Sequence, residues 1–168
     1  MNSEVEIVNI ALARLGESPV QSLDEGSVSA NMARVFYTPA KRAVLRAFPW
    51  SFSLKTARPA RLSGDTMGFH FAFSLPADCL RVIRCRKEGS PDFSESGTVR
   101  FSVRSGVLLA DESDFYIEYV ADVDDVTLFD DKFVEAFSYK LASDLAMPVK
   151  GSSELMANYM NVFTDLVK

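Results

Sequence analysis

The beginning of the sequence places apolar and polar residues with the period of an α-helix. Its apolar side chains recur every three or four positions, at Val5, Val8, Leu12 and Leu15. Ser3 precedes this pattern and Glu6 lies three residues further on, which is the spacing of a capping box. Gly16 follows the pattern and is typical of a helix end. We therefore predict a first helix between Ser3 and Gly16.

A second, longer helical pattern begins at Ser27 or Ser29 and ends at Pro49. It has a broad apolar surface formed by Ala30, Ala33, Val35, Phe36, Ala40, Ala43, Val44, Ala47 and Phe48. Pro39 lies inside this pattern and cannot donate a backbone hydrogen bond. We therefore expect a kink or a short break at Pro39.

The last part of the sequence predicts two more helices. One begins at Asp130 or Asp131 and ends near Pro148, and its turns are marked by Phe133, Ala136, Phe137, Lys140, Leu141, Asp144 and Leu145. The other begins at Ser152 or Ser153 and has apolar residues at Leu155, Met156, Tyr159, Met160, Phe163 and Leu166. Acidic residues at the start of the first of these helices suit the positive end of the helix dipole.

Between residues 50 and 127 the helical period gives way to alternation. Apolar residues alternate with other residues over 69–73, 99–103 and 115–119, as in half-buried strands. Ser105 and Gly106 form a two-residue turn signal between two such stretches, so a hairpin is expected there. The region predicts an antiparallel meander of four to six short strands.

Together these patterns predict an α+β fold. Residues 1–57 and 128–168 would form a four-helix bundle, and residues 58–127 would form an antiparallel β meander inserted into it, the whole being a single compact unit. A chain of 168 residues is long enough to bury a substantial core. Apolar runs stay shorter than a membrane span requires, so no membrane contact is expected.

Charge is distributed unevenly along the chain, although the net charge is only −5. Residues 41–104 contain twelve Lys or Arg and five acids, whereas residues 111–135 contain ten acids and one base, Lys132. Two complementary patches could join copies of the chain head to tail, as a cyclic ring requires. Candidate contact residues are Arg84, Arg86 and Lys87 on one side and Asp124 and Asp125 on the other. The alternative is that both patches are ordinary solvated surface.

Several kinds of chemistry are poorly supported by the residues. His70 is the only histidine and alternates with phenylalanines on a predicted strand, which favours an outward or polar contact over catalysis. Cys79 and Cys85 would lie about 20 Å apart on a regular strand, too far for a disulfide, so a reduced, cytosolic chain is expected. No metal-ligand spacing, phosphate-binding glycine motif or cofactor site is recognised. We predict no catalytic, metal or cofactor-binding residues.

Two other functions remain open alternatives. Clustered carboxylates between Asp122 and Asp131 could belong to a hydrolase acting on the bacterial cell wall, although caps and turns explain most of them. A DNA-binding function is suggested by two basic groups, which are Arg81, Arg84, Arg86 and Lys87, and Lys41, Arg42 and Arg46. The sequence pI of about 4.9 argues against tight DNA binding.

Several short stretches occur together in one order. They are residues 7–16 (IVNIALARLG), 48–52 (FPWSF), 73–82 (FSLPADCLRV), 129–133 (FDDKF), 136–137 (AF) and 141–146 (LASDLA). With these stretches the chain resembles the tail tubular, or head-to-tail adaptor, proteins of short-tailed bacteriophages. The resemblance implies a structural, non-enzymatic virion protein that forms a ring, commonly a dodecamer.

The resemblance also implies partners and a location. The ring would lie at the head-tail junction, between the portal protein and the tail nozzle protein, with DNA passing through its lumen without specific binding. The protein would be made in the cytoplasm of the bacterial host.

Among the stretches that carry the resemblance, we expect structural roles for Trp50, Pro76, Asp78 and Arg81. An aromatic residue as large as Trp50 favours an anchor between the bundle and the β region. Pro76 and Asp78 favour a fixed turn. Tyr159 and Phe163 on the last predicted helix are further interface candidates, although their spacing also fits an ordinary core.

Overall fold

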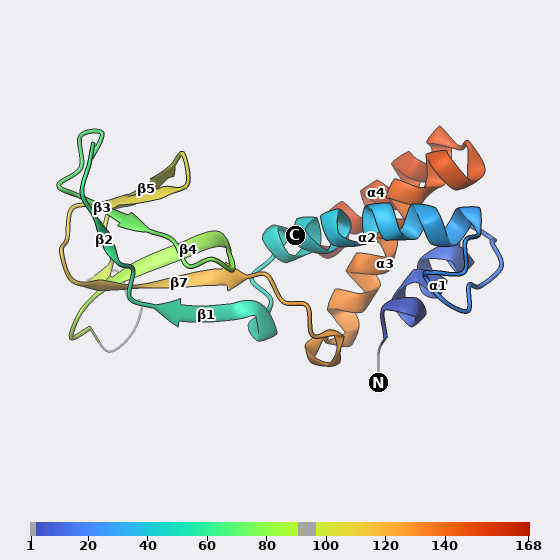
Figure 1. The fold of residues 1–168 in the computed structure, drawn as a ribbon, viewed down its shortest axis with the longest axis horizontal. Coiled ribbons are helices and arrows are strands. Elements are labelled where there is room, and N and C mark those ends of the chain that lie inside the picture. Colours follow the sequence, from blue (N-terminus) through green and yellow to red (C-terminus); the bar gives the residue numbers. More distant parts are fainter. Residues whose placement is uncertain (1–2, 91–96) are drawn as a thin grey trace. The chain divides into compact units, whose positions relative to one another are not determined.

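A computed structural model describes residues 3–90 and 97–168, and the chain divides into two compact units (Figure 1). The helical unit comprises Met1–Phe52 and Val123–Lys168, and the β unit comprises Ser53–Asp122. Helices together with antiparallel sheets confirm the α+β class. The division falls earlier than 57/58 and 127/128 because Leu54–Ala57 forms a strand of the β unit, and its partner strand ends at Ala121.

The first helix, α1 (Glu4–Arg14), is confirmed with its predicted cap. The Ser3 N–H donates to Glu6 Oε2 at 2.7 Å, and the Glu6 N–H donates to Ser3 Oγ at 3.1 Å. Gly16 follows the helix with a φ of 71°, a left-handed conformation that glycine adopts without strain. Helix α1 buries Ile7, Val8, Ala11 and Leu12.

Helix α2 (Val28–Ala47) is continuous, so the break expected at Pro39 is absent. Ser27 caps it by accepting a hydrogen bond of 3.2 Å from the Ala30 N–H. Pro39 lies on the exposed face together with Val35, whose carbonyl would otherwise accept from residue 39. Because both residues are exposed, a carbonyl freed by the proline costs less here than it would in the core.

Two helices complete the unit, α3 (Asp131–Lys150) and α4 (Ser153–Leu166). Helix α3 runs beyond the end predicted at Pro148, which lies in its last turn. The helix stops instead at Gly151, whose φ is 63° and whose N–H donates to the Met147 carbonyl at 2.9 Å. A left-handed glycine of this kind satisfies the last carbonyls of a helix.

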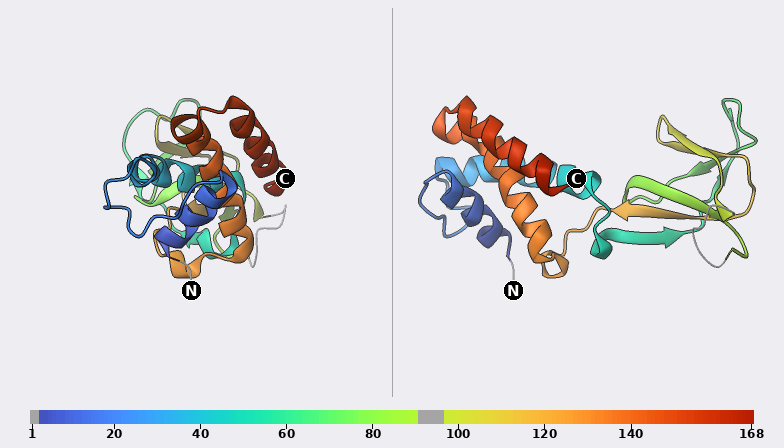
Figure 2. Two further views of the ribbon diagram at one scale, coloured as in Figure 1. Left: turned by 90° about the vertical axis from the view of Figure 1, so that its right-hand side faces the viewer. Right: turned by 180° about the vertical axis from the view of Figure 1, so that it is seen from behind.

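Helix α3 is the centre of the helical unit, because it packs against α1, α2 and α4 (Figures 1 and 2). Phe133, Phe137 and Leu141 of α3 are fully buried. The Phe133 ring lies against the rings of Trp50 and Phe52, at centroid distances of 5.2 and 5.0 Å. Edge-to-face contacts of this kind add to the stabilisation from buried area.

The β unit contains two antiparallel sheets. The order of the first is β1-β7-β4, formed by β1 (Leu54–Ala57), β7 (Phe115–Ala121) and β4 (Cys79–Lys87). The order of the second is β2-β3-β6-β5, formed by β2 (Arg61–Leu62), β3 (Phe71–Ser74), β6 (Val107–Ala110) and β5 (Phe101–Arg104).

This strand order differs from the single meander that we expected. Strand β7 pairs with β1 and β4, and β6 pairs with β3, so neighbours in the sheets are distant in sequence. The hairpin predicted at Ser105 and Gly106 is confirmed, with Arg104 paired to Val107 and both turn residues at positive φ. Alternation identifies a strand, but it carries no information about the partner strand.

The two sheets share a core. Phe73 of β3 and Phe115 of β7 meet edge to face with ring centroids 4.8 Å apart. Leu108, Leu109 and Ile117 are completely buried around them. Each unit therefore has its own apolar core.

Candidate interaction surfaces

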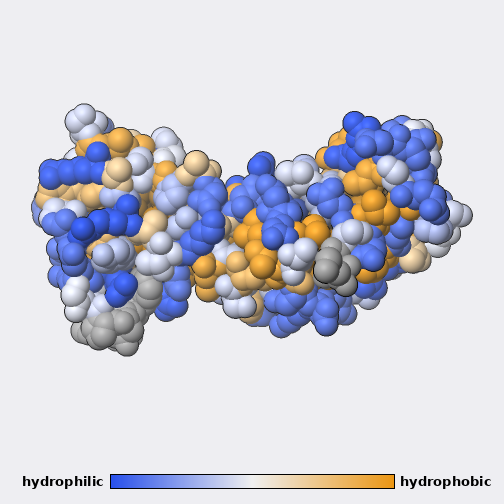
Figure 3. Space-filling view, turned by 60° about the horizontal axis from the view of Figure 1, so that its bottom comes forward, coloured by the Kyte–Doolittle hydropathy of each residue, from blue (hydrophilic) through white to orange (hydrophobic). Residues whose placement is uncertain are grey.

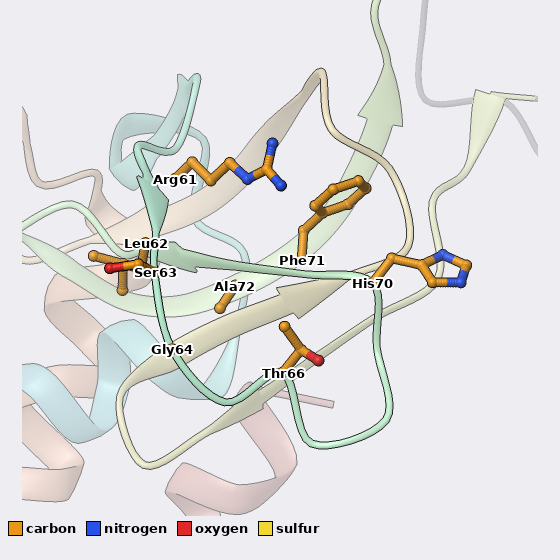
Figure 4. Close-up of a pocket in the computed structure, with 8 residues that line it drawn as sticks. All are labelled: Arg61, Leu62, Ser63, Gly64, Thr66, His70, Phe71 and Ala72. Carbon is orange, nitrogen blue, oxygen red and sulfur yellow. The ribbon is translucent and has the colours of Figure 1, made fainter.

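A shallow pocket lies at the β2–β3 hairpin (Figure 4). It has a volume of about 540 Å³ and is lined by Arg61, Leu62, Ser63, Gly64, Thr66, His70, Phe71 and Ala72. The Arg61 guanidinium lies 4.4 Å from the centre of the Phe71 ring, a cation–π contact that engages this charge. The His70 ring points away from the other lining side chains.

His70 is solvent-exposed, as its alternation with phenylalanines predicted. Its side chain is 75% exposed, and its Nδ1 lies 3.6 Å from Asp111 Oδ1. Asp111 also pairs with Arg100, whose Nε lies 3.2 Å from the other carboxylate oxygen. This arrangement is a surface charge cluster, and the carboxylate is shared rather than dedicated to orienting the imidazole.

A second, apolar groove lies in the β unit at strands β4 and β5. Its volume is about 300 Å³, and it is lined by Leu75, Cys79, Leu80, Arg81, Val82, Phe101 and Val103. Strand β4 is at the edge of one sheet and β5 at the edge of the other. We call this feature the β4–β5 groove.

The basic residues singled out on β4 make contacts within the same chain. Arg84 Nε lies 2.5 Å from Glu118 Oε2, and Lys87 Nζ lies 2.7 Å from Glu112 Oε1. Arg86 donates to the Ser90 carbonyl at 2.6 Å. Because β4 pairs antiparallel with β7, the basic middle and the acidic segment of the sequence meet within one β unit. Much of the charge segregation along the sequence is therefore neutralised inside the fold.

The second basic group lies on α2. Lys41 is buried, with 2% of its side chain exposed, and its ammonium pairs with the carboxylate of Asp124. Arg42 and Arg46 are exposed. The burial of Lys41 was not predicted from the sequence. Lysine is normally exposed, and the spacing of the apolar residues of α2 does not show that Lys41 is buried together with them.

The acidic candidates lie where the chain re-enters the helical unit. Asp124 is the partner of Lys41, whereas Asp125 caps the short 3-10 turn Val126–Leu128. Hydrogen bonds from the Thr127 hydroxyl and the Thr127 N–H hold the pKa of the Asp125 carboxyl below its usual value. Asp130 caps α3 by accepting from the Phe133 N–H at 2.7 Å.

An exposed leucine projects from this same segment. Leu128 is 52% exposed and is flanked in sequence by four exposed acids, Asp124, Asp125, Asp130 and Asp131. We call these five residues the acidic knob. The acids were identified from the sequence but Leu128 was not, because Val126 and Phe129 are also apolar and nothing in the sequence shows which of the three is exposed.

The helical unit exposes other apolar side chains as well. They include Ile10, Val28, Val35, Met147, Met156 and Val162. Figure 3 shows hydrophobic surface between hydrophilic side chains in this unit. Single exposed apolar residues are normal on soluble proteins, and Leu128 is of interest because four exposed acids flank it.

The residues expected to have structural roles are placed as follows. Trp50 is 2% exposed, and its indole N–H donates to the Val44 carbonyl at 2.9 Å. Trp50 also contacts the Phe133 ring, and Val44 and Phe133 both belong to the helical unit. The turn predicted around Pro76 is confirmed, because the Cys79 N–H donates to the Pro76 carbonyl at 3.0 Å.

Asp78 connects this turn to two strands. Its carboxylate accepts from Lys55 Nζ at 2.7 Å and from the Tyr119 hydroxyl at 2.9 Å. The Lys55 ammonium, followed by the Tyr119 hydroxyl, holds the pKa of Asp78 below its usual value. Arg81 is exposed on β4 at the β4–β5 groove.

The two interface candidates on α4 are largely enclosed by the helical unit. Phe163 is buried, with 8% of its surface exposed. The Tyr159 hydroxyl donates to the Arg14 carbonyl, and its ring lies 5.9 Å from that of Tyr139. Both side chains therefore pack inside the unit in this structure, and any partner would contact them only at their edges.

Cys79 and Cys85 are not joined by a disulfide. Cys85 is buried, and desolvation raises the pKa of its thiol to about 12. Cys79 is half-buried and lines the β4–β5 groove. Among residues 3–90 and 97–168, no group of three His, Cys, Asp or Glu side chains could hold a metal ion. No helix in these ranges is long and apolar enough to cross a membrane.

A comparison with known families finds a match for this chain. The family model described as "Tail tubular protein" matches residues 5–111. This stretch contains α1, α2 and strands β1 to β6, so it draws on both units. No curated protein sequence matches the chain.

Proposed function

Since the chain belongs to the tail tubular protein family, and is thereby a structural protein of the bacteriophage virion, we propose that it is the head-to-tail adaptor of a short-tailed phage or prophage. In this role copies of the chain form a ring, with a dodecamer as the expected size. The ring lies at the head-tail junction between the portal protein and the tail nozzle protein. DNA passes through its lumen.

The observation that carries this proposal is the family match over more than half of the 168 residues. The two-unit architecture supports it physically. A closed ring needs two different surfaces on each copy, because the contact between neighbours is heterologous. Each of the two units has its own core, so each can present one of these two surfaces.

The distribution of charge supports a lumen that does not retain DNA. The net charge is −5, and basic residues of β4 such as Arg84 and Lys87 are paired with acids of the same chain. Strong DNA binding depends on cations that are available to phosphates. A wall with few available cations lets DNA slide past.

Electron microscopy of the purified protein mixed with its portal protein tests the proposal. We expect closed rings stacked on the portal. If neither rings nor a portal complex form over a range of salt and protein concentrations, the adaptor function is wrong. A monomeric free protein is compatible with the proposal, since the portal can act as the template for assembly.

A further inference from the structure

We propose that neighbouring copies join by inserting the acidic knob of one copy into the β4–β5 groove of the next, with Leu128 in the groove. This inference rests on the proposed ring and names the contact that would build it. It replaces the earlier candidates Arg84, Arg86 and Lys87, because their charges are engaged within the chain. The groove and the knob are two different surfaces of the chain, as a heterologous contact requires.

The groove has the features of an apolar receptor site. Leu80, Val82, Phe101 and Val103 line it, and Val103 is 43% exposed. Its volume of about 300 Å³ is ample for one leucine side chain. Burial of the exposed part of Leu128 in such a site favours association, because apolar surface is removed from water.

The knob is held in a fixed conformation. Leu128 ends the 3-10 turn that Asp125 caps, and its N–H donates to the Asp125 carbonyl at 3.2 Å. The next residue, Phe129, is 5% exposed and anchors the turn in the aromatic core, with its ring 4.6 Å from that of Phe133. A side chain presented on a fixed turn loses little conformational entropy when it binds.

The charges of the two surfaces are complementary. Arg81 lines the groove, and Arg104 lies next to Val103; both are exposed and make no ion pair within the part of the chain that the structure describes. The acids of the knob are exposed on either side of Leu128; Asp124 pairs with Lys41, whereas Asp125, Asp130 and Asp131 make no ion pair with another residue that the structure describes. Opposite charges around an apolar contact steer association and fix its orientation. This complementarity within one sequence identifies a second copy of the chain as the partner.

A native thiol makes the contact directly testable. Cys79 lines the groove, whereas the other cysteine, Cys85, is 1% exposed and does not compete. A donor chain carries Leu128→Cys and Cys79→Ser together with a size tag, and the acceptor is the wild-type chain. A disulfide requires Cα atoms closer than about 7 Å, so it reports a specific approach. Under mild oxidation we expect a donor–acceptor heterodimer whose yield rises with concentration.

Three variants show whether the contact is specific. A donor with Val35→Cys and Cys79→Ser offers a thiol at another exposed valine of the helical unit, where 59% of the side chain is accessible. An acceptor with Arg81→Glu places like charges at the rim, which we expect to lower the yield about tenfold. The acceptor Arg46→Glu changes an exposed arginine on α2 and should leave the yield unchanged.

The outcomes separate this contact from the ring itself. The inference is overturned if no heterodimer forms, if the Val35→Cys donor forms it equally well, or if Leu128→Cys with Cys79 intact forms only an intrachain disulfide. Rings on the portal without the cross-link would leave the adaptor function standing and remove this contact. A cross-link without rings on the portal would support the contact and remove the adaptor function.

Discussion

The Tyr119 hydroxyl donates a hydrogen bond of 2.9 Å to Asp78 Oδ1, and this bond joins strand β7 to the turn that precedes β4. Lys55 of β1 reaches the same carboxylate, so one acid links all three strands of the first sheet. A second bond strengthens the link, because the Asp122 N–H donates to the Asp78 carbonyl at 2.7 Å. The turn around Pro76 and Asp78, which the sequence comparison singled out, therefore holds the three strands of this sheet together through the hydrogen bonds of Asp78.

Replacing Asp78 should destabilise the chain. Asp78→Ala leaves the Tyr119 hydroxyl without its acceptor and Lys55 without its ion pair, which costs about 2 kcal/mol of unfolding free energy at neutral pH. Urea denaturation measures this cost. Glu135→Gln, a change at an exposed acid on α3, serves as the control and should alter stability by less than about 0.5 kcal/mol. Equal stability of the two variants would contradict a fastening role.

The same carboxylate should make stability depend on acid. The pKa of Asp78 is lowered in the folded chain, so its contribution is fully present above the usual aspartate pKa of 3.8. The contribution is lost as the pH falls from that value through the lowered pKa. We expect the difference in unfolding free energy between wild type and Asp78→Asn to shrink from pH 6 to pH 2. A difference that is constant over this range would show that ionisation of Asp78 does not contribute.

Tyr119 should make stability depend on alkali in the opposite sense. Burial, aided by the hydrogen bond to Asp78, raises the pKa of Tyr119 from 10.0 to about 12. The unfolded chain releases this proton first as the pH rises, so stability falls between about pH 10 and pH 12. Tyr119→Phe removes this part of the alkaline loss, and equilibrium unfolding at pH 8 and pH 11 measures it. A loss of the same size in the variant would assign the effect to other tyrosines.

The two cysteines should react at very different rates. Cys79 is half-buried, whereas burial raises the pKa of Cys85 to about 12 and leaves almost no thiolate at neutral pH. We expect one equivalent of thiol reagent to react with the folded chain and two with the unfolded chain. In Cys79→Ser the folded chain should react negligibly. Rapid labelling of this variant without denaturant would mean that Cys85 is accessible.

The buried lysine on α2 should tolerate an apolar replacement of similar length. Lys41→Met removes a buried charge but fills the same volume, and its partner Asp124 is 90% exposed and remains hydrated. We expect an unfolding free energy within about 1 kcal/mol of wild type for Lys41→Met, and a loss of about 2–4 kcal/mol for Lys41→Ala, which leaves a cavity. Urea denaturation followed by the fluorescence of Trp50 compares them. If Lys41→Met is as unstable as Lys41→Ala, the ion pair itself is required.

The helices could be predicted from the sequence because their determinants lie within a few residues of one another. The Ser3 and Glu6 capping box is one example, and the Ser152 cap of α4, which accepts from the Leu155 N–H at 3.1 Å, is another. Helix interruptions were harder to predict. Whether a proline breaks a helix depends on the exposure of the carbonyl that it frees, and tertiary packing decides that exposure.

The strand pairing and the β4–β5 groove could not be predicted in this way. Glu118 lies opposite Arg84 because of the β4–β7 register, and the two residues are 34 positions apart in the sequence. Alternating residues reveal a strand's two faces but not its neighbour. The groove therefore became visible only with the sheet order, although Arg81 and Cys79 at its edge had been singled out for other reasons.

The central position of α3 has a consequence for protein synthesis. Helices α1 and α2 leave the ribosome early, but the helix against which both pack is encoded after the whole β unit. Until residue 150 has emerged, their apolar faces have no α3 to cover them, whereas the β unit can already fold around its own core. The acidic knob, which directly precedes α3, acquires its anchored form at the same late stage. A nascent chain therefore cannot offer the proposed contact to its neighbours before α3 has been synthesised.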